Sequence, residues 1–309
     1  RSALAGGVID LDAIEVAWAS GKRVGGRRHA GAWRSLDLEV TPLLENVAFT
    51  ESTVADVRLS VVPSVRTQLW RGVTLDAAAR VALYQSPRWF LFDGPRPDPQ
   101  LERATLGWLH RIPLGGTWGG WAEWSAGRLD VDHLGVRQQS RVASPGGRVE
   151  MGLDVALVGA STAELDRLYA VGSLGTFLPE IGAHVSLSGG RFLDDDTGVG
   201  LDVSRFFGDT RLSLFARRTD AENVAGLQVA IPLSSRKDLR PRAIRPRVTS
   251  AFRPGVQTVV GGDRNPIRRD VGRFLSPETS LAFRHLDWGR LAPVWVEQRL
   301  ADPRFWPGG

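Results

Sequence analysis

The feature that most constrains this chain is a two-residue alternation of apolar and polar side chains over strand-length stretches. It is clearest in residues 183–204, where Val185 and Leu187, and then Leu201 and Val203 after an acidic turn, alternate with small or polar residues. Successive side chains of a β-strand point to opposite faces, so each strand has one apolar and one polar face. A soluble sheet buries the apolar face, whereas a membrane barrel turns it toward lipid and keeps a polar lumen.

The alternation recurs along the chain in roughly ten to twelve segments of about ten residues, which is the pattern of a transmembrane barrel. We therefore predict an all-β fold, an antiparallel transmembrane β-barrel over residues 51–255. A large soluble β-sandwich or a lipocalin-like barrel has the same pattern and stays open as an alternative. Four tryptophans at or near predicted strand ends favour the membrane, where aromatic belts mark the interface, although tryptophan is also an ordinary core residue: Trp70, Trp89, Trp118 and Trp124.

The two ends of the chain have different patterns. Residues 1–50 differ from the rest of the chain and begin with a predicted short acidic helix that stops at Ser20-Gly21. Residues 256–309 form a basic tail that could hold further strands. No stretch approaches the roughly 20 apolar residues of a membrane-spanning helix.

Charge and composition narrow the classes of partner. The chain has 39 Lys and Arg against 34 Asp and Glu, and only Lys22 and Lys237 are lysines. A GC-rich coding sequence explains arginine over lysine, and an anionic partner is the other explanation. The arginines are scattered along strands and not clustered on one helix, which argues against nucleic acid. There is no cysteine, which excludes disulfides and thiolate metal sites.

The polar faces of the predicted strands carry more arginines than carboxylates. Unpaired charge in a narrow lumen is unfavourable, so we expect part of this set to pair across strands. The positive excess predicts a lumen that favours anionic solutes or acidic sugar polymer. The alternative is that the arginines only plug the barrel through salt bridges. The candidate lumen-lining residues are Arg58, Arg66, Arg80, Arg103, Arg111, Glu123, Arg148, Glu150, Asp154, Asp202, Arg211 and Arg217.

Catalysis has little support in the sequence. Glu123, Glu150, Asp154 and Asp202 are candidates for a glycosidase carboxylate pair, but nothing fixes their separation. The five histidines lack metal-ligand spacing, and there is no nucleophile elbow or phosphate loop. We therefore expect no enzyme activity, no cofactor and no metal.

One run of this chain reads VSLSGGRFLDDDTGVGLDVSRFFGDTRLSLFARRTD and closes with GLQVAIPL. This run resembles the YjbH/GfcD family of bacterial exopolysaccharide-associated outer-membrane proteins, and the resemblance is densest here. VRLSVVPSVRTQLW is similar to the strand that opens the family's C-terminal barrel, ALAGGVIDLDAI to the end of the α/β region before it, and RPRAIRPRV to a later basic strand. The resemblance covers most of residues 3–250 and leaves the tail after about 255 unaligned.

The resemblance implies a Gram-negative outer-membrane barrel that acts in export or assembly of a secreted polysaccharide, either exopolysaccharide or capsule. It also implies a longer parent protein, in which residues 1–50 are the end of a preceding periplasmic α/β region and a linker. The expected periplasmic partner is a protein of the OPX (Wza-like) polysaccharide export class. The alternative function is a soluble β-rich glycan-binding or glycan-cleaving domain. The face that carries Met151, Leu153, Val155 and Leu157 separates the two, because it is exposed in a lipid-facing sheet and covered in a soluble one.

Overall fold

The structure is a computed structural model of the chain. The residues it describes are 36–50, 53–70, 72–87, 99–115, 118–162, 164–193, 195–234, 244–261, 272–275, 279–285 and 294–296. The predicted acidic helix before Ser20 and the aromatic Trp89 lie outside these ranges. No helix within them is long and apolar enough to cross a bilayer.

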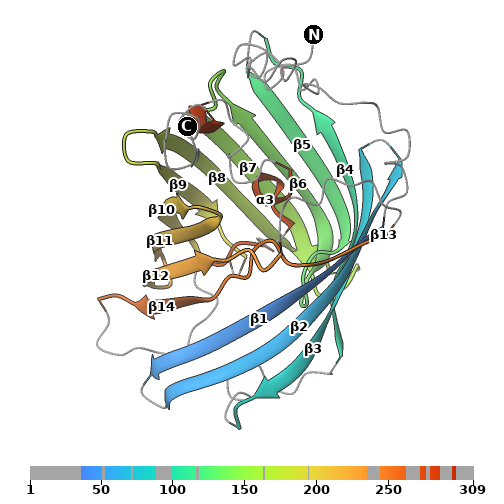
Figure 1. Ribbon diagram of the computed structural model, residues 1–309, viewed down its shortest axis with the longest axis vertical. Helices are drawn as coiled ribbons and strands as arrows, with labels where there is room; N and C mark the ends of the chain where they lie inside the picture. Colours follow the sequence, from blue (N-terminus) through green and yellow to red (C-terminus); the bar gives the residue numbers. More distant parts are fainter. Residues whose placement is uncertain are drawn as a thin grey trace, which may run out of the picture.

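Within these ranges, fourteen strands form one strongly curved sheet (Figure 1). Strands β1 to β12 lie side by side in chain order, and β13 and β14 are added at the two edges. The all-β prediction is therefore confirmed. The strands are β1 Leu36–Thr50, β2 Thr53–Trp70, β3 Val73–Gln85, β4 Gln100–Arg111, β5 Gly119–Arg128, β6 Leu134–Ala143, β7 Val149–Gly159, β8 Arg167–Leu178, β9 Ala183–Arg191, β10 Thr197–Phe207, β11 Thr210–Thr219, β12 Asn223–Ala230, β13 Ile244–Val248 and β14 Gly255–Val259.

The alternation in sequence becomes an alternation in burial. On β4, Arg103 and Thr105 are buried on the concave face, whereas Leu106 and Trp108 are exposed on the convex face. On β2, Arg58 and Ser60 are likewise buried. The polar face of the sheet is thus the inner one, which reverses the arrangement of an ordinary soluble sheet.

The sheet is antiparallel except at one edge, and strand pairing does not close it into a barrel. Strand β13 pairs with β1 in parallel, and β14 pairs with β12 in antiparallel fashion. Both edge strands belong to one segment, 244–259, which we call the seam. The seam also forms backbone hydrogen bonds from Thr249 N to Val40 O at 3.0 Å and between Ile231 and Phe252. The Asn46 side chain donates to Gly255 O at 3.0 Å, so β1 touches the first residue of β14.

The sheet begins before residue 51 and ends after residue 255. Strand β1 pairs with β2 along almost its whole length, which makes it a full member of the sheet. Strand β14 lies within the part of the chain that was predicted as a tail with room for further strands. Connections at one end of the sheet, which we call the turn end, include residues 144–148 and 208–209. Those at the opposite loop end include residues 129–133 and 192–196.

The described residues of the C-terminal part of the chain lie inside the curve of the sheet. We call these residues, 272–275, 279–285 and 294–296, the inner segment. At the loop end, Gly272 N donates to Asp196 Oδ2 at 2.7 Å. At the turn end, Val294 N donates to Gly146 O at 3.1 Å. Between them lies the short helix α3, Leu281–Arg284, which Figure 1 shows in front of the inner face of β6 and β7.

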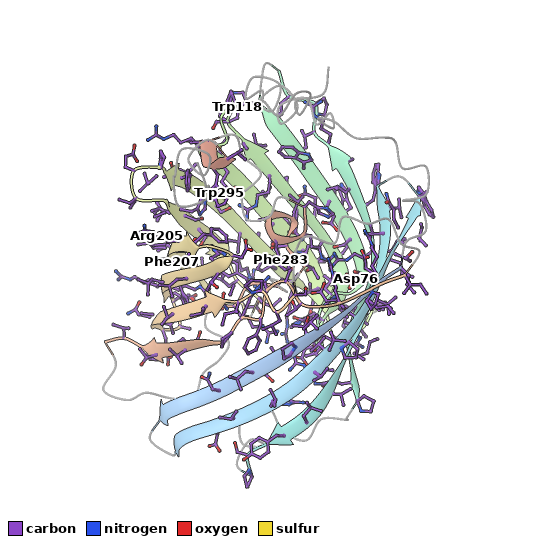
Figure 2. The ribbon with its side chains drawn as sticks, in the orientation of Figure 1. Asp76, Trp118, Arg205, Phe207, Phe283 and Trp295 are labelled. Atoms are coloured by element: carbon purple, nitrogen blue, oxygen red, sulfur yellow. The ribbon has the colours of Figure 1, made fainter. Side chains whose placement is uncertain are left out.

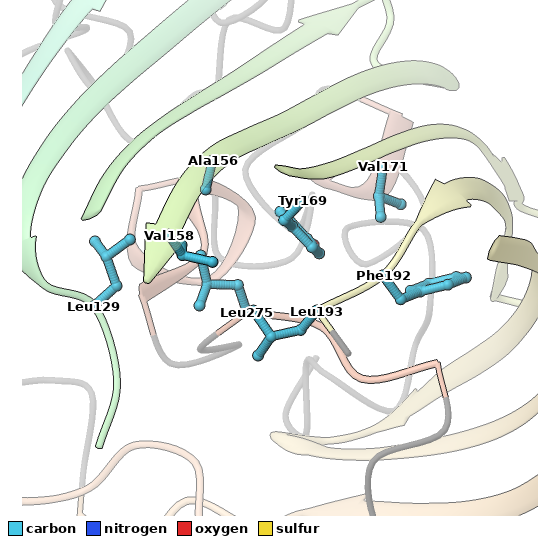
Figure 3. Close-up of a cluster of buried hydrophobic side chains, with 8 residues drawn as sticks. All are labelled: Leu129, Ala156, Val158, Tyr169, Val171, Phe192, Leu193 and Leu275. Carbon is cyan, nitrogen blue, oxygen red and sulfur yellow. The ribbon is translucent and has the colours of Figure 1, made fainter. Parts of the chain in front are cut away.

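An apolar cluster joins the inner segment to the inner face of the sheet near the loop end (Figure 3). Tyr169 and Val158 come from adjacent strands, Phe192 and Leu193 from a loop, and Leu275 from the inner segment. Fully burying a side chain of this size contributes about 1.5–3 kcal/mol. The cluster therefore holds the start of the inner segment against the sheet. Its members are Leu129, Ala156, Val158, Tyr169, Val171, Phe192, Leu193 and Leu275.

Candidate functional site

The concave face of the sheet and the inner segment enclose a polar cavity of about 720 Å³. Among the described residues, its walls carry eleven arginines against seven carboxylates. The inward side chains come from alternate positions of neighbouring strands, which is why so many charges of strands far apart in sequence meet there. This cavity is the candidate functional site.

The most buried ion cluster is centred on Asp76 of β3. Its carboxylate accepts hydrogen bonds from Arg66 Nε at 2.9 Å, Arg103 Nε at 2.5 Å and Arg284 Nη2 at 2.7 Å. The first two arginines come from the strands on either side of β3, and the third comes from α3. Arg284 also lies 3.9 Å from Glu123 Oε1, and His285 Nε2 lies 3.6 Å from Glu123 Oε2. One carboxylate thus ties the inner segment to three strands.

A second group of charges spans β1 to β4. Arg80 binds both oxygens of Glu102, at 2.7 and 2.8 Å, and donates to Glu45 at 3.2 Å. Arg58 Nε lies 4.0 Å from the same Glu45. Paired guanidinium–carboxylate geometry of this kind is strong and directional, so these strands are held in register from the inside.

A third group, on β6 and β7, forms hydrogen bonds with uncharged groups of the inner segment. Arg137 binds both oxygens of Asp154 and donates through Nη1 to Thr279 Oγ1 at 2.7 Å. Gln139 donates to Thr279 O at 3.2 Å and accepts from Leu281 N at 2.9 Å. Side chains of β6 therefore hold the start of α3 by hydrogen bonds.

Nearer the turn end, charges of β6, β7 and β9 meet. Glu150 lies 3.3 Å from Arg141 and 3.2 Å from His184 Nε2. On the next strands, Arg211 donates to Ser204 Oγ at 2.8 Å and to Asp202 at 3.4 Å. These are looser contacts than those around Asp76.

Two further arginines of the cavity stack on aromatic rings. The guanidinium of Arg217 lies 4.6 Å from the ring centroid of Phe215 and 4.8 Å from that of Phe274. The guanidinium of Arg253, in the seam, lies 4.3 Å from the ring of Phe283. Phe283 is labelled within the curve of the sheet in Figure 2. Phe274 and Phe283 belong to the inner segment, so both stacks join it to the walls.

At the loop end, Asp130 organises the loop between β5 and β6. Its Oδ1 accepts from the backbone N–H groups of Asp132 and His133 at 2.9 Å and lies 2.8 Å from His133 Nδ1. Its Oδ2 accepts from Arg273 at 3.2 Å. Burial would raise the pKa of Asp130, but the His133 hydrogen bond and charge, Arg273 and the Asp132 N–H together lower it below its ordinary value.

The structure gathers most of the predicted lumen-lining residues in this cavity or in the ion clusters around it. Arg111 and Arg148 differ, because their side chains are exposed near the turn end. Prediction from sequence missed Glu45, Glu102, Arg137 and Arg141, which the same strand alternation could have assigned to the inner face. Arg284 carried no such signal, because it lies on a single helical turn outside any strand pattern.

The arrangement is suited to binding. Glu123 lies beside Arg284 and His285, and Asp154 is held by Arg137. No group of three potential ligands among the described residues could hold a metal ion. An arginine-rich, hydroxyl-bearing cavity can hold anions and polar polymers through hydrogen bonds.

The convex face of the sheet is apolar and exposed. Leu153 is 47% exposed and Trp108 is 52% exposed, and comparable residues lie on nearly every strand from β1 to β14. Met151 and Leu157 share the face of Leu153 and are also exposed, so no described part of the chain covers it.

No family model, no curated protein and no solved structure matches this chain. Function is therefore inferred from the two faces of the sheet.

Proposed function

We propose that this protein is an outer-membrane protein of Gram-negative bacteria that takes part in export or assembly of a secreted polysaccharide. In this proposal its strands cross the bilayer as a barrel, and its arginine-rich interior faces the polymer. The single observation that carries the proposal is the pairing of an exposed apolar convex face with a charged concave face.

The energetics of the convex face support a lipid environment. Soluble monomers rarely expose contiguous apolar patches larger than a few hundred Å², because such surface drives association. Here exposed leucines, valines and tryptophans run around the sheet from Val40 on β1 to Val256 on β14. Most strands have the roughly 9–11 residues or more that a tilted transmembrane strand needs. Lipid acyl chains would cover this apolar surface without any further protein.

A bilayer also requires that sheet edges find partners, because unsatisfied backbone groups are costly in hydrocarbon. The seam is placed to supply them, since it already pairs with β1 on one side and β12 on the other. Asn46 and Gly255 mark where β1 and β14 approach each other. We expect these two strands to complete the barrel when the chain is inserted in lipid.

Aromatic residues support an interface near the turn end. Trp108 of β4 is the direct cross-strand partner of Trp124 of β5, and both are exposed on the convex face. Trp70 ends β2 and Phe207 ends β10, at the same end of the sheet. Aromatic side chains with a polar edge collect at membrane–water boundaries. This row is suited to the headgroup level of one leaflet.

The interior supports a polar, anionic or hydroxyl-rich cargo. Eleven arginines, several serines and four phenylalanines line the cavity among the described residues. The inner segment now occupies part of the same space, so polymer passage requires that it move. The resemblance of residues 181–233 to exopolysaccharide-associated outer-membrane proteins agrees with this cargo, and it is the basis for naming a polysaccharide.

Partnership with a periplasmic export protein of the OPX class is part of the proposal. A barrel has no means of moving polymer across the periplasm, so a second protein must deliver it. The turn end presents compact connections at Pro145–Gly147 and Gly208, and β1 starts there. We expect the partner to dock at this end.

A soluble glycan-binding domain is the second candidate, favoured by the fact that strand pairing leaves the sheet open. In that case the convex face would have to be covered by another protein surface. Isolation of a monodisperse, lipid-free monomer in plain buffer would favour this candidate.

Gene deletion with complementation tests the proposed function. We expect the deletion strain to lose secreted polysaccharide and the wild-type gene to restore it, while the membrane fraction holds the protein. Affinity capture from membranes should recover an OPX-type protein with the wild-type chain. Unchanged polysaccharide in the deletion strain, together with recovery of the protein from the soluble fraction, would contradict the proposal.

A further inference from the structure

The wall arginines that contact the inner segment meet mainly neutral groups on it. Arg217 stacks on Phe274, Arg253 stacks on Phe283, and Arg137 donates to the hydroxyl of Thr279. Elsewhere in the cavity, arginines such as Arg66 and Arg80 bind carboxylates at 2.7–2.9 Å. The inner segment is therefore held at these points by contacts that an anion could replace with stronger ones, because a guanidinium binds a carboxylate more strongly than it binds a neutral group.

Arg217 is the clearest case. It forms no ion pair with any residue that the structure describes, and its charge is met by the faces of Phe215 and Phe274. Asp202, on the neighbouring strand, forms its ion pair with Arg211 and acts on Arg217 through its charge at longer range. The guanidinium lines the open cavity, so a ligand entering the cavity would reach it.

A trough of small side chains leads across the sheet to Arg217. Cross-strand pairing places Gly152, Ser173, Ser188 and Gly200 in one row, which ends at Arg217. A Cβ at Gly200 would lie 2.8 Å from Ser188 Oγ and 3.4 Å from Arg217 Cγ. A larger residue at this position would therefore fill part of the trough. Hydroxyl groups at Ser173 and Ser188 are suitable partners for sugar hydroxyls.

We propose that this cavity binds an oligosaccharide that carries carboxylate groups, and that the ligand displaces the inner segment. In this exchange, Arg217 and Arg253 leave Phe274 and Phe283 and bind carboxylates of the ligand. The trough beneath them accepts the sugar rings. This inference rests on the proposed function for its cargo and adds the residues that bind the acidic groups and the event that opens the path of the polymer.

The cavity dimensions agree with a short saccharide. A volume of about 720 Å³ lies within the usual range for ligand sites, roughly 300–1,000 Å³. Phe215 lines the cavity beside the trough, and an aromatic ring can pack against the C–H face of a sugar. Charge, hydroxyls and ring faces together describe an acidic sugar better than a free anion.

Calorimetry with the purified full chain in detergent micelles tests the binding. The probes are a tetragalacturonate, a neutral maltotetraose of the same length, and inorganic phosphate. We expect tetragalacturonate to bind at least about tenfold more tightly than either of the other two. The double variant R217Q/R253Q should lose about tenfold in affinity for it. The matched control is R191Q, because Arg191 is exposed and its guanidinium pairs with the exposed Asp195 at 3.0 Å, outside the cavity.

Thiol labelling tests the displacement, since the chain has no cysteine of its own. Ala282 is buried in α3 and lines the cavity, so A282C should react slowly with a thiol reagent. Tetragalacturonate should speed its labelling several-fold, and maltotetraose should not. A cysteine at the exposed Arg148 should label at the same rate throughout.

Three results would overturn the inference. They are equal affinity for the neutral and acidic saccharides, equal affinity for phosphate, or full affinity in R217Q/R253Q. Unchanged labelling of A282C with saturating tetragalacturonate would overturn the displacement. Failure of the proposed function would give a different result. If the chain binds tetragalacturonate but does not insert into lipid, this inference holds and the membrane assignment is wrong.

Discussion

Arg284 donates a 2.7 Å hydrogen bond to Asp76, a residue 208 positions earlier in the chain. The Arg284 side chain is 5% exposed and that of Asp76 is 2% exposed. Buried charges are stable only when they are paired, so this contact anchors α3 within the curve of the sheet, and a ligand that displaces α3 has to break it. The helix α3 is therefore a component of the interior.

Asp76→Asn should destabilise the fold strongly. The substitution leaves three arginines facing a neutral amide, and breaking a buried pair in this way costs about 3–5 kcal/mol. Urea unfolding in micelles measures the loss. Glu180→Gln is the control, because Glu180 pairs with Arg148 on the surface, and we expect it to change stability by less than about 1 kcal/mol. Equal losses in the two variants would contradict the importance of the buried cluster.

Acid should weaken the loop end through Asp130. Its pKa in the folded chain is lowered, so its stabilising contribution is complete above the unfolded value of about 3.9 and is lost as pH falls through the folded value. Asp130→Asn should therefore be less stable at neutral pH and show a flatter acid limb. The measurement is the free energy of unfolding of both proteins as the pH is lowered from neutral to below the ordinary pKa of aspartate. Asp132→Asn, an exposed neighbour, should keep the wild-type acid limb.

The inner segment should keep the channel closed. In planar bilayers we expect the wild-type chain to conduct little, because its arginines are engaged by carboxylates and by the inner segment. Phe274→Ala combined with Phe283→Ala removes both ring contacts and should raise conductance, with a preference for anions because of the arginine excess. An open, cation-preferring wild-type pore would contradict both parts.

Glu123, beside the cavity, and Asp154, in its wall, should not be needed for any chemical change of the polymer. Glu123→Gln and Asp154→Asn should leave secreted polysaccharide nearly unchanged per folded molecule, although Asp154→Asn should lower stability because Arg137 loses its partner. Assay of new reducing ends in purified polysaccharide is the measurement. Glycan cleavage that disappears in either variant would promote the glycosidase alternative.

Local patterns predicted the strands well, whereas the closed barrel that we predicted from them is not seen, because strand pairing leaves the sheet open. The alternation in residues 149–157 places Leu153 outside and Asp154 inside, as the structure does, because strand geometry alone decides it. The parallel pairing of β13 with β1 was not predictable in this way, since it joins residues some 200 positions apart. The inner segment was missed for the same reason. Its position depends on contacts of Arg284 with β3 and of Thr279 with β6. Local sequence patterns do not predict contacts between residues so far apart in the chain.

Insertion of the Leu153 variants into liposomes tests the central claim, that the convex face meets lipid. Arginine near the bilayer centre on a lipid-facing strand costs about 2–4 kcal/mol, whereas phenylalanine keeps the surface apolar. We therefore predict that the wild type and Leu153→Phe insert and show heat-modifiable migration, and that Leu153→Arg does neither. Normal insertion and migration of Leu153→Arg would contradict the account.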